Sequence, residues 1–150
     1  MGLISKTLEQ AQQRGQQNNL PYSGALTPAE AHLLLSNAPG AKIVDVRCKA
    51  ELDWVGRIPG AIEIEWATYP GMKPNPNFLA ALEQQLDKES LVMFICRSGA
   101  RSNQAATLAA QAGFTEAYNV LDGFEGDRDA NGHRNTTTGW RAANLPWQQS

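Results

Sequence analysis

The sequence predicts an α/β fold with a central parallel five-stranded sheet and helices on both faces. Short apolar runs alternate about five times with segments of helical period along the chain. The run from Leu91 to Ile95 is apolar throughout, as in strands that are covered on both faces. Such an alternation favours parallel strands joined by helices. In these sheets ligands bind at the carboxyl ends of strands, so residues that directly follow a strand are candidates for a site.

Each element has its own local signal. A short amphipathic N-terminal helix is expected from Leu3 to about Gln17. Thr27 is a good N-cap for the next helix, because Pro28 follows at the first helical position and Glu30 completes a capping box. Expected helices cover about 3–17, 28–36, 50–53, 76–86 and 102–112, the last with Gly113 after its end. Expected strands cover 20–22, 42–47, 61–64, 91–95 and 117–120.

Length and composition set the outer bounds. A chain of 150 residues with 42% apolar and 19% charged residues fits one folded domain. We divide it into a helical extension over 1–19 and a domain over 20–150, with a polar, turn-rich insertion at about 126–139. Net charge is −2, which argues against a general nucleic-acid or acidic-membrane binder.

The expected compartment is the cytoplasm. No apolar stretch approaches the roughly 18 residues that span a bilayer, and the first residues lack the pattern of a secretory signal. Cys48 and Cys96 are the two cysteines, fewer than a disulfide scaffold of this size usually carries.

The segment from Cys96 to Ser102 has the sequence CRSGARS and is the most informative part of the chain. It follows a buried strand and precedes a helix, so Cys96 lies before a helix N-terminus and beside two arginines. Helix dipole, arginine charges and free backbone N–H groups all favour a thiolate. We therefore expect a nucleophilic cysteine, Cys96, that attacks or holds a small anion.

Several segments together resemble a single-domain rhodanese, a sulfurtransferase. They occur in the order found in that family and cover residues 20 to 147: DVR at 45–47 with Glu51, GRIPGA at 56–61, CRSGARS at 96–102, then GF at 113–114, NV at 119–120, Gly123, Trp140 and LP at 145–146. The cysteine loop is the specific part of this match, and the other segments are individually weak.

The resemblance implies a thiosulfate sulfurtransferase-like enzyme in which Cys96 becomes a persulfide. The sulfane sulfur would come from a donor such as thiosulfate and pass to cyanide, a thiol or another protein. No cofactor and no metal is implied, and neither nucleic acid nor membrane is expected as a partner. The anion cradle would consist of Arg97, Ser98, Gly99, Ala100, Arg101 and Ser102.

Two other functions stay open. A cysteine-dependent phosphatase or arsenate-reductase relative also uses a cysteine and an arginine, but such phosphatases place five residues between them. Here four residues separate Cys96 from Arg101, which favours sulfur over phosphate. A non-enzymatic sulfur carrier or interaction module would have the same loop, so the sequence does not separate it from an enzyme.

Supporting roles are expected for residues around the loop. Arg47 and Glu51 are expected to form an ion pair, and Asp45 is a candidate to hydrogen-bond the cysteine loop. Arg101 is expected either to anchor the loop through its carbonyls or to touch substrate. Ser102 is expected to cap the following helix, and Cys48 is most simply a free thiol.

Residues 127–132, with the sequence DRDANG, reproduce the first half of a calcium-binding loop. The twelfth position is Thr138 in place of a bidentate glutamate, and no helices are expected beside the segment. We therefore interpret it as part of the polar insertion, which could gate the site or meet a partner protein.

Overall fold

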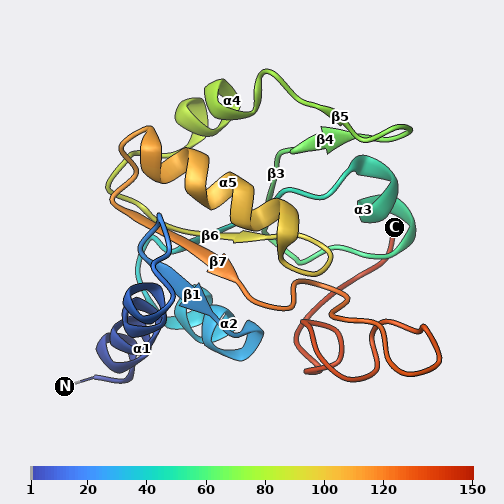
Figure 1. Cartoon of the computed structure of the whole chain (residues 1–150), viewed down its shortest axis with the longest axis horizontal. Helices are drawn as coiled ribbons and strands as arrows, with labels where there is room; N and C mark the ends of the chain where they lie inside the picture. The colour runs from blue at the N-terminus through green and yellow to red at the C-terminus, as the bar shows by residue number, and fades with distance from the viewer. Residues whose placement is uncertain (1) are drawn as a thin grey trace.

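The computed structural model describes residues 2–150 and confirms the predicted fold class. Five parallel strands form one sheet in the order β1-β7-β6-β2-β3 (Figure 1). The strands are β1 (Gly24–Leu26), β2 (Lys42–Asp45), β3 (Ile62–Glu63), β6 (Leu91–Ile95) and β7 (Glu116–Val120), and a separate hairpin pairs β4 (Ala67–Thr68) with β5 (Lys73–Pro74). β6 lies at the centre of the sheet, so its carboxyl end is enclosed by neighbours on both sides.

Helices cover both faces of this sheet. They are α1 (Leu3–Gln17), α2 (Pro28–Asn37), α3 (Lys49–Trp54), α4 (Phe78–Gln85) and α5 (Ala100–Gln111). Figure 1 shows α4 and α5 on one face and α1 and α2 on the other, with the C-terminal segment close to α3. All five helices were predicted from the sequence, with ends that differ by a few residues.

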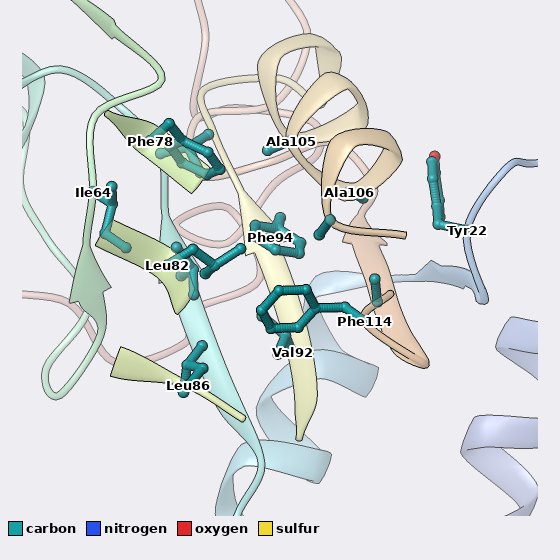
Figure 2. Packing of buried hydrophobic residues seen from close by; sticks show 14 of the residues in the cluster. Tyr22, Ile64, Phe78, Leu82, Leu86, Val92, Phe94, Ala105, Ala106 and Phe114 are labelled. Carbon is teal, nitrogen blue, oxygen red and sulfur yellow. The ribbon is translucent and has the colours of Figure 1, made fainter. Parts of the chain in front are cut away.

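The core has two parts because successive side chains of a strand point to opposite faces. Val92 and Phe94 pack with side chains of α4 and α5, as Figure 2 shows. Met93 and Ile95, the residues between and after them, pack in the second cluster with α1, α2 and Trp140. All four strand side chains are fully buried, and burial of each contributes about 2 kcal/mol. β6 is therefore a rigid base for the residue that follows it.

α2 begins with the predicted capping box. The Thr27 hydroxyl accepts the backbone N–H of Glu30, and the Glu30 carboxylate accepts the N–H of Thr27. Arg14 of α1 also donates two hydrogen bonds to Glu30. The same glutamate thus caps the start of α2 and ties this helix to α1.

The predicted edge strand at residues 20–22 is wrong. The first strand is β1, four residues further on, and it pairs with β7. Its sequence, Gly-Ala-Leu, has low strand propensity. Pairing with β7 and cover from α1 determine the position of this strand, and a local pattern does not contain that information.

The predicted polar insertion has no helix or strand between residues 126 and 139. Asp129 organises it: the carboxylate accepts the backbone N–H groups of Asn131 and His133 and the hydroxyl of Thr136. These bonds occupy both carboxylate oxygens of Asp129, one of the side chains that a calcium ion would need.

Further on, Trp140 is completely buried, and its indole N–H donates to the Pro146 carbonyl. Within residues 2–150 no helix is long and apolar enough to cross a bilayer.

Candidate active site

Cys96 lies where the sequence predicted a nucleophile, directly after β6 and before α5. Its side chain is only 1% exposed. Gly99 is the N-cap of α5 and has a φ of 108°, a left-handed conformation that favours glycine. This conformation turns the chain so that the Gly99 N–H donates to Cys96 Sγ at 3.1 Å. A backbone donor aimed at sulfur stabilises negative charge there.

Ser102 is the second polar group at the sulfur, and its predicted capping role is wrong. α5 begins at Ala100, so Ser102 lies inside its first turn, fully buried, with Oγ 3.3 Å from Cys96 Sγ. Its hydroxyl donates to Asn119 Oδ1 at 2.6 Å, while Asn119 Nδ2 donates to the Gly99 carbonyl. Because a hydroxyl has one proton, Ser102 in this state accepts from the protonated thiol. Rotation of the same hydroxyl can deliver a donor to the thiolate.

The backbone of the segment from Gly123 to Gly126 donates hydrogen bonds to carbonyls of the cysteine loop. The Phe124 N–H donates to the Cys96 carbonyl at 2.8 Å, and the Glu125 and Gly126 N–H groups donate to the Arg97 carbonyl. Gly123 has a φ of 63°, and a Cβ there would lie 2.5 Å from the Cys96 carbonyl oxygen. Gly123 was named in the resemblance and Gly126 at the start of the expected insertion, but no hydrogen bonds from this segment to the cysteine loop were predicted.

Arg101 is anchored by Glu51. Its guanidinium donates to both carboxylate oxygens, at 2.7 and 2.9 Å. Burial alone would raise the pKa of the Glu51 carboxyl, but the hydrogen bonds and charge of Arg101 outweigh burial and lower that pKa to about 2. This pairing replaces the predicted anchoring of Arg101 by its own loop carbonyls.

Cys48 lies on the other side of Glu51 and is a free thiol, like Cys96. Burial is the main cause that raises the pKa of the Cys48 thiol, and the Glu51 carboxylate adds to it. The protonated thiol donates to Glu51 Oε1 at 3.2 Å. Cys48 also stands at the N-cap of α3, where its backbone N–H donates to Glu51.

The predicted ion pair between Arg47 and Glu51 is wrong, and so is the predicted contact of Asp45 with the cysteine loop. Arg47 and Asp45 are both completely buried and bind each other, with Nη2 2.7 Å from Oδ2. Residues two apart on an extended chain share a face, which explains this choice of partner. Arg47 also donates to the Gly56 carbonyl and lies 4.1 Å from the ring centre of Phe124. The pair therefore supports the segment that holds Cys96, without touching the sulfur.

A cavity of about 930 Å³ opens beside the cysteine loop. Arg97 and Arg101 are the loop residues that line it, together with Glu51 and Cys48. Arg97 is exposed and forms no ion pair within residues 2–150. The other lining residues are Ala50, Trp54, Val55, Tyr69, Met72, Glu125, Gly132, His133, Arg134 and Asn135.

The remaining residues of the predicted cradle lie elsewhere around the loop. Ser98 lines a separate cavity of about 520 Å³ with the 127–134 segment, and Ala100 is exposed at the start of α5. Backbone N–H groups in the first turn of α5 have no intrahelical partner, and with the helix dipole they favour an anion. Among residues 2–150, no cluster of three or more His, Cys, Asp or Glu side chains could hold a metal ion.

Fold and site together define an α/β domain with a buried cysteine in the loop between the end of the central strand and the N-terminus of a helix. The family model for the rhodanese-like domain matches residues 27–130, more than half of the chain. The protein therefore belongs to the rhodanese-like domain family.

Individual relatives agree with this membership. The crystal structure of Rv0390 from M. tuberculosis is 49% identical, covers 86% of this chain and 99% of that one, and has a TM-score of 0.79. Uncharacterized protein RP600 of Rickettsia prowazekii is 36% identical over 126 residues, or 81% of this chain and 93% of that protein. Thiosulfate sulfurtransferase 16, chloroplastic, of Arabidopsis thaliana is 30% identical over 111 residues, or 73% of this chain and 88% of that protein.

Proposed function

We propose that the protein is a sulfurtransferase that moves a sulfane sulfur from a donor such as thiosulfate to a thiophilic acceptor through a persulfide on Cys96. The observation that carries the proposal is the setting of the sulfur: Sγ accepts the Gly99 N–H, faces the Ser102 hydroxyl and precedes the first turn of α5. Similarity to a thiosulfate sulfurtransferase of Arabidopsis thaliana supports the same chemistry.

The reaction has two displacement steps. In the first, the Cys96 thiolate attacks the outer sulfur of thiosulfate, the sulfur–sulfur bond of the donor breaks, and sulfite leaves with the bonding electron pair. In the second, cyanide or a thiolate attacks the outer sulfur of the persulfide, and Cys96 leaves as a thiolate. Atoms and electrons balance in each step without an oxidant or a cofactor.

The loop residues would act on the charges that these steps create. The donor carries two negative charges, and Arg97 beside the loop would attract it, whereas the charge of Arg101 is largely compensated by Glu51. The Gly99 N–H and the rotating Ser102 hydroxyl would stabilise the thiolate and then the persulfide. The bidentate hold of Glu51 on Arg101 supports sulfur transfer over phosphate chemistry, because it directs both donors of one guanidinium edge away from a substrate.

Mass spectrometry of the full chain after incubation with thiosulfate tests the proposal. We expect a gain of one sulfur atom, located on Cys96 by peptide mapping and absent in Cys96→Ser. Cys48→Ser is the matched control and should keep the adduct, since its thiol binds Glu51. Absence of any adduct on Cys96 would refute the proposal. Steady-state transfer to cyanide then separates an enzyme from a sulfur carrier, which would load but turn over slowly.

A further inference from the structure

Exposed apolar side chains are concentrated at the cavity beside the cysteine loop. Within residues 2–150 the exposed large apolar residues are Leu3, Trp54, Tyr69 and Met72, at 63%, 76%, 63% and 42% exposure. All of them except Leu3 line this cavity. They come from the end of α3 and from the turn between β4 and β5, which Figure 1 shows on the same side of the molecule. We call Trp54, Tyr69 and Met72 the apolar rim.

The cavity is far larger than the proposed sulfur donor. Its volume of about 930 Å³ lies near the top of the range, roughly 300 to 1,000 Å³, of sites that enclose drug-sized molecules. An anion of a few atoms would occupy a small part of that space beside the loop. The rim and the far wall of the cavity therefore leave room for a larger group.

The charged residues of the cavity favour a negatively charged group. Arg101 is neutralised by Glu51, but Arg97 and Arg134 form no ion pair within residues 2–150. Glu125 is the other carboxylate in the lining. The lining thus has an excess of positive charge, although the chain as a whole is negative.

The high exposure of the apolar rim favours a protein over a small molecule as the ligand of this surface. A small molecule inside the cavity would leave most of Trp54 and Tyr69 in water, since these side chains are 76% and 63% exposed. Tryptophan, tyrosine, methionine and arginine are also the residue types enriched in the cores of protein interfaces. A covering polypeptide would bury the rim and place an acidic stretch over Arg97 and Arg134.

We propose that the apolar rim and these arginines dock an acidic segment of a partner protein, which presents a cysteine thiol to the Cys96 persulfide. The partner is thus the sulfur acceptor. This inference rests on the proposed function. In the transfer step the partner's thiolate attacks the outer persulfide sulfur, the sulfur–sulfur bond breaks, and Cys96 leaves as a thiolate. The partner's cysteine becomes the persulfide, and no oxidant is needed.

The test uses the full chain loaded with sulfur and a synthetic peptide that has one cysteine between glutamate and leucine residues. Mass spectrometry follows the loss of sulfur from Cys96, with 2-mercaptoethanol as a small neutral acceptor. We expect Trp54→Ala or Tyr69→Ala to lower the peptide's kcat/KM about tenfold relative to that of 2-mercaptoethanol. Leu3→Ala is the matched control, equally exposed but outside the cavity, and should leave both rates unchanged. A peptide with lysine in place of glutamate should react more slowly.

Three results would overturn the inference. One is a peptide rate that the rim variants leave unchanged. Another is a lysine peptide that reacts as fast as the acidic one. The third is an equal rim effect on glutathione, which would indicate a site for small anionic thiols.

Failure of the proposed function would be visible separately. Binding of a labelled peptide with serine in place of cysteine, measured by fluorescence anisotropy, needs no sulfur chemistry. If thiosulfate fails to load Cys96 but the rim variants still weaken peptide binding, the docking surface is supported and the sulfur-transfer step is refuted. If the peptide does not bind, docking itself is refuted.

Discussion

Glu51 links Arg101 to Cys48, and Glu51→Gln tests how strongly this link stabilises the fold. The pKa of the Glu51 carboxyl falls from its ordinary value of 4.5 to about 2 because Arg101 outweighs the opposing effect of burial. One pKa unit corresponds to about 1.4 kcal/mol, so this shift corresponds to about 3.5 kcal/mol at most. Both side chains are 17% exposed, and solvent screening lowers the expected loss near neutral pH to about 2 kcal/mol.

The pH dependence follows from the direction of this shift. A carboxyl whose pKa is lowered in the folded protein contributes its full stabilisation above 4.5, where it is ionised in the folded and the unfolded chain. As the pH falls from 4.5 towards 2, the unfolded chain takes up the proton first, and the contribution is lost. The stability difference between wild type and Glu51→Gln should therefore shrink to less than half by a pH of about 3.

Urea unfolding at a series of pH values measures this difference. Glu63→Gln is the matched control, because it breaks a single 3.4 Å contact with Arg57 on the surface and should cost less than about 1 kcal/mol. The reasoning would be refuted if Glu51→Gln cost no more than the control, or if its cost were the same at low and neutral pH.

The segment behind the cysteine loop and the buried ion pair give two further predictions. Gly123→Ala should lower the free energy of unfolding by about 2 kcal/mol or more and slow persulfide formation, because its Cβ would displace the Cys96 carbonyl. Gly40→Ala is the control, because Gly40 has a similar φ but open space around it, and it should lower the free energy of unfolding by about 1 kcal/mol in the same urea assay. Equal costs would contradict this reasoning. Arg47→Met should lower the free energy of unfolding by about 3 to 5 kcal/mol, because it leaves Asp45 buried and unpaired. In thermal unfolding, the double variant Arg47→Met, Asp45→Leu should recover most of that stability. A double variant as unstable as the single one would argue against an uncompensated charge as the cause.

Much of the fold could be predicted from sequence because its signals are local. The capping box at Thr27 and Glu30 lies within four residues, and the apolar run of β6 identifies a buried strand before any partner is known. β1 could not be predicted in the same way, since its pairing with β7 joins residues more than 90 positions apart. Secondary structure was recovered where propensity and packing agree.

The candidate site shows the same division. The position of Cys96 follows from the order of strand, loop and helix. The partner of Arg101 does not, because Glu51 is 50 residues away and has Arg47 as a nearer cation. Arg47 instead binds Asp45, which shares its face of the extended chain. The sequence indicated which charged residues lie near the site, but residues close in sequence were paired where the structure pairs Arg47 with Asp45 and Arg101 with Glu51.

The backbone bonds behind the cysteine loop determine which groups the loop leaves free. The carbonyls of Cys96, Arg97 and Gly99 all accept hydrogen bonds from within the protein. Most of the loop's acceptor capacity is therefore used up, whereas first-turn N–H groups stay available. The loop therefore presents backbone N–H donors and few free carbonyls, a polarity that would favour an anion even without the two arginines. Replacing Arg97 or Arg101 should thus weaken the attraction of an anion without reversing it.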